Sequence, residues 1–427
     1  MNCIFTGNFN EEHIINRKLR MIGPALKTST AAVLNNLSCE SYRERESSRL
    51  MKMGDPEPAI LPTGNALRIQ KFKQIKAQRR HDDSLTALYF MKCEDDFKTI
   101  IRDLGCDPFF ADYYTSEQIH LYRSYCKHER FPKLIIDATG SVVKQFKKFG
   151  LEKTSSIFLY EGVVHDKVAG HSFTALNMLS ERHSNLAIAR WLGKWCACDV
   201  PKPKESVCDN SLALLSALAQ SFTQYSSLKD YVRACADLLT GRIAAEEQWI
   251  PRCFIRIDIA HFVKITCKWT PLKSTPRRVR EVVLRAVGLL IKSQSITEIR
   301  SMLLSLFVVL TNETDGIGSN KRSTQCEEHK QRLLQATSTG FQDFQEQFDY
   351  ILACAGDEDE ARVSLEQEYD RQNEGLENFE NPFQAWADVI YCESKSLIEE
   401  GNGINPFFCP SLVKIIIKTL KLLPLWS

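Results

Sequence analysis

The sequence lacks the cysteine spacing of zinc sites and of disulfide scaffolds. It has 15 cysteines among 427 residues, but none forms a Cys-x-x-Cys pair, and the closest two are Cys196 and Cys198. Zinc ribbons need such pairs, and disulfide-dense proteins are typically small and secreted. The pattern therefore predicts reduced, buried thiols in an intracellular protein.

Targeting and nucleotide-binding patterns are also absent. Residues Met1–Asn10 lack the charged stretch and apolar core of a signal peptide. Two apolar runs, Ser301–Leu310 and Ile415–Leu425, are too short to cross a bilayer. No GxGxxG or P-loop pattern occurs. We therefore expect no membrane partner and no small-molecule cofactor.

Charge is nearly balanced in total but uneven along the chain. The formal net charge is +2, yet the first 80 residues are rich in basic residues and residues 356–380 are acidic. Apolar and cationic residues alternate in one basic stretch, whose cations are Arg68, Lys71, Lys73, Lys76, Arg79 and Arg80. This pattern predicts either a solvated helix face or contact with the phosphate backbone of DNA.

Two short apolar runs each end in an acid. Leu134–Ile136 precedes Asp137, and Ser206–Cys208 precedes Asp209. An acid at the end of a buried strand is costly unless it is paired or holds a metal. Two such acids therefore suggest a divalent-metal site for phosphoryl transfer. The alternative interpretation is a turn or cap residue that binds nearby backbone N–H groups.

The order of predicted elements suggests how these acids meet. Five strands are predicted, three of them antiparallel neighbours: Leu134–Asp137, Ser141–Phe146 after a turn at Gly140, Ser156–Val164, Glu205–Cys208 and Cys253–Ile257. A helix is predicted over Ser172–Cys198, and Ser211 could cap the next one. This is the element order of the ribonuclease-H-like fold. Its crossover would place the first and fourth strands side by side and parallel, with Asp137 near Asp209.

We therefore predict an α+β protein with three regions. Residues 1–130 form a helical, basic region that includes a helix at Phe97–Leu104. Residues 131–270 form a ribonuclease-H-like domain with a mixed five-stranded sheet and helices. Residues 271–427 form a helical insertion with a polar loop at 312–330 and an acidic, mobile segment at 356–380.

Several motifs together resemble a known family. They are LIIDATGSVVK, IFLY, LSERHSNLAIARWLGKW, VCDNSLALLSAL and IRIDIAHFVKI. Over roughly residues 90–310 they resemble the DDE transposase core of Mutator-like elements. The resemblance is to a eukaryotic branch known mainly as transposon-derived, uncharacterised or domesticated proteins.

The resemblance implies a chemistry and its residues. In this family, three acids hold two Mg²⁺ or Mn²⁺ ions for DNA cleavage and strand transfer. The first two acids map to Asp137 and Asp209. The family usually has Cys-x-x-His after the next strand, where this sequence has Asp258 and His261. A structural role is therefore expected for this second pair.

The third acid is not identified by the resemblance. It is expected after the helical insertion and a motif like PLWS, which stands here at Pro424–Ser427. The third acid is therefore expected to be absent, because the chain is truncated or the gene is decayed or domesticated. The alternative is that Glu393, on a predicted helix, substitutes for it. The sequence predicts a nuclear, transposase-derived protein with DNA as its partner, catalytically incomplete in its present form. A domesticated, non-catalytic DNA-binding or protein-interaction factor is the alternative, and homo-oligomerisation stays open.

Overall fold

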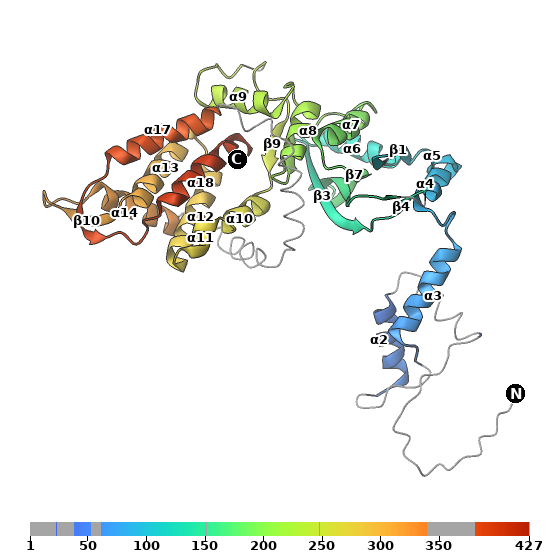
Figure 1. The fold of residues 1–427 in the computed structure, drawn as a ribbon. Coiled ribbons are helices and arrows are strands. Elements are labelled where there is room, and N and C mark those ends of the chain that lie inside the picture. The colour runs from blue at the N-terminus through green and yellow to red at the C-terminus, as the bar shows by residue number, and fades with distance from the viewer. Residues whose placement is uncertain are drawn as a thin grey trace, which may run out of the picture. The chain divides into compact units, whose positions relative to one another are not determined.

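The computed structural model describes residues 23, 38–52, 61–149, 152–246, 248–339 and 381–426. The chain divides into two units, residues 1–91 and residues 92–427, and each is taken by itself below (Figure 1). The sequence also predicts helices at Glu11–Gly23 and Phe341–Cys354. The first, apart from Gly23, lies outside the described residues, and so do the second and the acidic segment at 356–380.

The first unit contains two helices that pack on each other. They are α2 (Cys39–Leu50) and α3 (Gly64–Ala77). Leu67 of α3 is buried against Cys39 and Tyr42 of α2. The rest of α3 exposes most of its side chains, among them Arg68, Lys73 and Lys76. In the sequence, α4 (Ser84–Cys93) spans the division between the units, and α5 (Asp95–Lys98) belongs to the second unit.

A mixed seven-stranded sheet forms the centre of the second unit. In spatial order its strands are β1 (Ile101–Cys106), β2 (Phe109–Tyr113), β7 (His171–Ser180), β6 (Ile157–Asp166), β3 (Lys133–Val143), β8 (Glu205–Cys208) and β9 (Phe254–Ile257). The strands from β1 to β3 in this order are antiparallel to their neighbours, whereas β8 and β9 run parallel to β3. A mixed sheet with many helices is consistent with the predicted α+β class.

Buried aromatic side chains pack the helices against one another and against this sheet. The helices next to it are α6 (Ser116–His128), α7 (Asn185–Cys196), α8 (Leu212–Phe222) and α9 (Leu228–Leu239). Trp191 and Trp195 of α7 are fully buried. The ring of Trp195 lies 4.7 Å from that of Tyr122 on α6, and the Trp191 indole donates to the Asn177 carbonyl on β7 at 3.1 Å.

The C-terminal part is mainly helical. Its elements are α10 (Ile259–Cys267), α11 (Thr270–Ser274), α12 (Arg277–Lys292), α13 (Ile296–Thr311), β10 (Thr314–Gly318), α14 (Gln325–Thr339), α17 (Pro382–Ser396), β11 (Gly401–Ile404), α18 (Pro410–Leu420) and the 3-10 helix η2 (Leu423–Leu425). Helices α12, α13, α14, α17 and α18 pack together, in yellow to red in Figure 1. No helix of the described residues has the length and apolarity of a membrane span.

The predicted hairpin at Gly140 is wrong. β3 continues through this position as one strand, and Gly140 pairs with Phe158 of β6. The register shifts between Gly140 and Val143, so the glycine accompanies an irregularity in the ladder and not a chain reversal. The antiparallel neighbours of this strand are therefore β6 and, beyond it, β7. A separate two-stranded ribbon follows β3, formed by β4 (Lys147–Lys148) and β5 (Glu152–Lys153).

Three other elements were misassigned from local pattern. The segment from Ser172 to Ser180 belongs to a strand, β7, and α7 begins only at Asn185. Residues 101–104 belong to β1 and not to a helix. The polar loop expected at 312–330 contains β10, which pairs with β11. Strand pairing overrides the helical or loop preference of each segment. β1 pairs with the adjacent β2, whereas β7 and β10 pair with strands distant in sequence.

Candidate functional site

The parallel pairing of β3 and β8 determines where the two predicted acids lie. Ile136 stands opposite Cys208 in the register, so Asp137 and Asp209 each follow the last paired residue of this ladder at the same edge of the parallel strands. The prediction that the strand ends at Asp137 is wrong, since β3 continues to Val143 beside β6. The expectation that these two strands are parallel neighbours is confirmed. β9 pairs with β8 in the same direction, and Asp258 follows it at the same edge.

Asp137 is exposed and bonded locally. The N–H of Ala138 donates to its Oδ1 at 2.8 Å, and the hydroxyl of Thr139 donates to its Oδ2 at 3.1 Å. These are the backbone and hydroxyl contacts that the alternative interpretation, a turn-like carboxylate, requires. They also hold the carboxylate in one orientation while leaving it open to solvent.

Asp209 is more enclosed, with a side chain that is 19% exposed. Its Oδ1 lies 3.4 Å from Nδ1 of His261 on the first turn of α10. Asp258 caps the same helix by accepting from the His261 N–H at 2.9 Å. The Asp-x-x-His pair therefore orders the first turn of α10 and brings the imidazole to Asp209.

The pKa of the Cys208 thiol indicates that three carboxylates lie near it. Burial raises the pKa of Cys208 well above its usual range, and the negative charges of Asp209, Asp258 and Asp137 raise it further. Each of these carboxylates therefore lies near enough to act on one buried sulfur. The thiol stays protonated, and the negative charge of this edge resides on the carboxylates.

The structure adds an acid that the sequence analysis did not include. Glu161 on β6 stands directly opposite Asp137 in the antiparallel register of β3 and β6. Directly opposed residues have Cβ atoms about 4.5–5.5 Å apart, and like charges in this position are destabilising. The same row continues to Asn177 of β7. Correct strand pairing, rather than any local motif, would have revealed this acid.

A buried histidine contacts Ser211 in the turn that follows Asp209. His183 is 3% exposed and lies between two hydroxyl groups, 2.8 Å from the Tyr160 oxygen through Nδ1 and 2.7 Å from the Ser211 oxygen through Nε2. The N–H of Ser211 donates to the Asp209 carbonyl at 2.8 Å. Ser211 takes the N-cap position of α8, but its side chain makes no cap bond and contacts His183. Ser211 thus holds the predicted cap position, but without a side-chain cap bond.

Other predicted site residues lie elsewhere. Glu393 on α17 forms an ion pair with Arg300 on α13. In the first unit, Arg68 pairs with Glu40 of α2, and Lys76 lies 3.8 Å from Asp82. The remaining cations of the basic stretch are Lys71, which is half-buried, and Lys73, Arg79 and Arg80, which are exposed.

Two side chains at this edge of the sheet are suitable ligands for a divalent cation such as Mg²⁺. Carboxylate oxygens are preferred Mg²⁺ ligands, and Mg²⁺ is often held by one or two carboxylates with water or phosphate completing its shell. Asp137 and Asp209 supply two such groups. Across the ranges that the structure describes, no group of three or more His, Cys, Asp and Glu side chains is arranged to hold a metal ion.

Comparison with known proteins gives one informative match. No family model matches the chain. Over 393 residues the chain is 28% identical to the 120.7 kDa protein in NOF-FB transposable element of Drosophila melanogaster. The match covers 90% of this chain and 34% of the relative, so the chain spans about a third of that protein's length. The chain is thus similar to a transposable-element protein, and the Mutator-like assignment stays a prediction.

The buried histidine predicts a dependence of stability on pH. Burial lowers the pKa of His183 to about 4, whereas an unfolded histidine takes up its proton near pH 6.5. The unfolded state therefore binds more protons between these values, and stability falls as the pH falls. From this group alone, the free energy of unfolding should drop by about 2 kcal/mol between pH 7 and pH 5.

Urea unfolding of the wild type and of His183→Gln at pH 7, 6 and 5 measures this contribution. The variant should lose that part of the pH dependence, while His171→Gln, at an exposed position, should behave as the wild type does. Equal pH slopes in the wild type and His183→Gln would contradict the assignment of a buried, neutral imidazole.

Proposed function

We propose that this chain is a transposon-derived, nuclear DNA-binding protein built on a ribonuclease-H-like core of the Mutator-like type. The observation that carries the proposal is the parallel register of β3 and β8, which brings Asp137 and Asp209 to one sheet edge. The similarity to a transposable-element protein supports the same origin.

The strand order supports the ribonuclease-H-like part of the proposal. In sequence order, β3, β6 and β7 are successive antiparallel neighbours, and β8 and β9 then join β3 in parallel on its other side. Helix α7 lies in the crossover from β7 to β8. This is the order expected from the resemblance, with β1 and β2 added beyond β7.

In this proposal Asp137 and Asp209 hold Mg²⁺ or Mn²⁺. When bound, such an ion polarises phosphate oxygens and lowers the pKa of a bound water. The chain's own residues prepare the site: Thr139 orients the Asp137 carboxylate, and His261 orients that of Asp209. Glu161 is the acid best placed by register to supply a further carboxylate, and Glu393 is the candidate that the sequence offered.

DNA cleavage and strand transfer belong in this proposal to the ancestral form. The proposal of a catalytically incomplete chain rests on the resemblance, which assigns two acids, Asp137 and Asp209, and leaves the third unassigned. The same observation favours the second candidate function, a domesticated factor that binds DNA or protein without chemistry. The two candidates differ in whether the sheet edge still binds a divalent cation.

Mn²⁺ binding tests the metal site. A ligand present at a hundredfold excess over its dissociation constant stabilises a fold by about 2.7 kcal/mol. Mn²⁺ should therefore raise the melting temperature of the wild type but not that of Asp137→Asn or Asp209→Asn. Asp199→Asn, at an exposed aspartate away from this edge, is the matched control and should keep the full shift.

The same melting measurements on Glu161→Gln and Glu393→Gln identify a further metal ligand. Only the substitution that removes a ligand should reduce the Mn²⁺-induced shift in melting temperature. Equal Mn²⁺ shifts in the wild type and Asp137→Asn would sink the metal-site proposal. The non-catalytic candidate would then stand alone.

The α3 cations predict a salt-dependent DNA affinity. Each phosphate contact on duplex DNA contributes about 0.9 to the slope of log affinity against log salt concentration. Replacing Lys71, Lys73 and Lys76 with alanine should therefore reduce the slope by up to about 2.7 in a fluorescence-anisotropy titration. Lys414 and Lys418, exposed on α18, provide the control substitutions. An affinity independent of salt in the wild type would remove α3 as a backbone-binding helix.

A further inference from the structure

A polar pocket opens at the edge of the sheet opposite to the acids. It has a volume of about 780 Å³ and is lined by Lys204, Gln224, Glu246, Gln248, Ile250, Pro251 and Arg252. Lys204 immediately precedes β8, and Arg252 lies two residues before β9. The pocket therefore lies where these parallel strands begin, whereas Asp209 and Asp258 follow their ends. Five residues of extended chain separate Lys204 from Asp209, which corresponds to about 17 Å.

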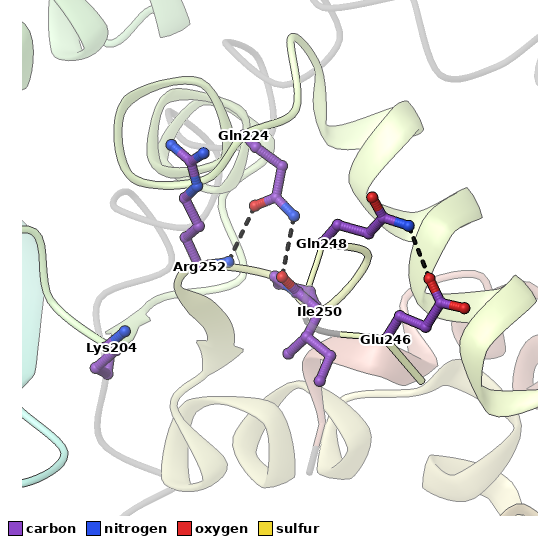
Figure 2. Close-up of a pocket in the computed structure, with 7 residues that line it drawn as sticks. Lys204, Gln224, Glu246, Gln248, Ile250 and Arg252 are labelled. Atoms are coloured by element: carbon purple, nitrogen blue, oxygen red, sulfur yellow. Dashed lines mark hydrogen bonds between the residues drawn. The ribbon is translucent and has the colours of Figure 1, made fainter. Parts of the chain in front are cut away.

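The backbone around the pocket is held by several hydrogen bonds. The side chain of Gln224 accepts from the Arg252 N–H at 3.0 Å and donates to the Ile250 carbonyl at 3.0 Å (Figure 2). The N–H of Lys204 donates to the Pro132 carbonyl at 2.8 Å, and its own carbonyl accepts from Phe254 at 2.8 Å. Both cationic residues thus extend from fixed positions.

The cations of this pocket are not neutralised. Among the residues that the structure describes, neither Lys204 nor Arg252 has an acidic partner, and both are exposed. Glu246 lies across the pocket from Lys204 in Figure 2, and its carboxylate accepts from Gln248 at 2.7 Å. The side chains of Lys204 and Arg252 are therefore available to bind an anion.

A third cation lies close by. Burial raises the pKa of Cys253 to about 12, the charge of Glu205 raises it further, and Lys202 and Lys204 act in the opposite sense. Both ammonium groups therefore lie near the start of β9. Trp249, between two lining residues in the chain, is 45% exposed, and its carbonyl accepts from the Tyr225 hydroxyl at 3.0 Å.

We propose that this pocket binds the phosphate backbone of a single nucleic-acid strand, with Lys204 and Arg252 as the phosphate contacts. Proteins bind single strands by pairing cationic side chains with the phosphates and by stacking bases on aromatic rings. Lys204 and Arg252 line the pocket, and the exposed Trp249 lies between two lining residues in the chain. The inference deepens the proposed function, since it gives the sheet a second DNA contact at the edge opposite to the acids.

Anisotropy titration of a labelled oligothymidylate in EDTA tests the site, because no divalent cation is then needed. Each phosphate contact on a single strand contributes about 0.7 to the salt slope, so Lys204→Ala with Arg252→Ala should reduce it by about 1.4. Loss of two charge-assisted contacts should weaken binding by about tenfold or more. Lys414→Ala with Lys418→Ala is the matched control and should leave the slope unchanged.

Two further variants make the result decisive. Lys204→Arg with Arg252→Lys keeps both charges and should retain binding. Asp137→Asn should also retain it, which separates this site from the metal-site proposal: the pocket stands if this variant binds oligonucleotide without any Mn²⁺ response. An unchanged salt slope in the double alanine variant would overturn the inference. Displacement of the oligonucleotide by polyglutamate of equal charge and concentration would also overturn it, in favour of an acidic peptide.

Discussion

The parallel pairing of β3 with β8 is the constraint on which the candidate site depends. The strands come from segments about seventy residues apart, and their register runs from Lys133 opposite Glu205 to Ile136 opposite Cys208. At the start of this ladder, the Lys133 ammonium lies 3.1 Å from the buried Glu205 carboxylate. A shift by one residue would move every side chain of a strand to the other face, so this register decides which acids meet.

Several carboxylates lie close together where β8 and β9 end, and their mutual repulsion destabilises the fold unless other groups compensate it. Asp137 stands opposite Glu161, and Asp209 and Asp258 follow neighbouring strands. Like charges placed together disfavour the folded state unless a cation, a proton or hydrogen bonds compensate. Backbone N–H groups and His261 provide part of that compensation. A divalent cation bound at this edge, as proposed above, would compensate the remaining charge.

Local sequence placed only one of the two acids at a strand end. Asp209 follows the last residue of β8, whereas β3 continues past Asp137 to Val143, so Asp137 lies inside a strand. The parallel pairing of these two strands was predicted correctly from the order of elements. The hairpin at Gly140 failed because local pattern does not distinguish a turn from a glycine inside a long strand. β7 was predicted as part of a helix because local periodicity reveals neither its pairing with the distant β2 nor its hairpin with β6. Glu161 was missed because only the register of β3 and β6 places it opposite Asp137. The pocket near Lys204 depends on three separate segments and has no sequence motif.

The location of bound Mn²⁺ in crystals of the protein tests the central claim most directly. Anomalous scattering recorded at the manganese absorption edge identifies the ion independently of water. The account predicts a peak between the carboxylates of Asp137 and Asp209, with Mn²⁺–oxygen distances of about 2.0–2.2 Å, similar to those of Mg²⁺. A fully soaked crystal with no peak at this edge, or with manganese bound only elsewhere, would contradict it.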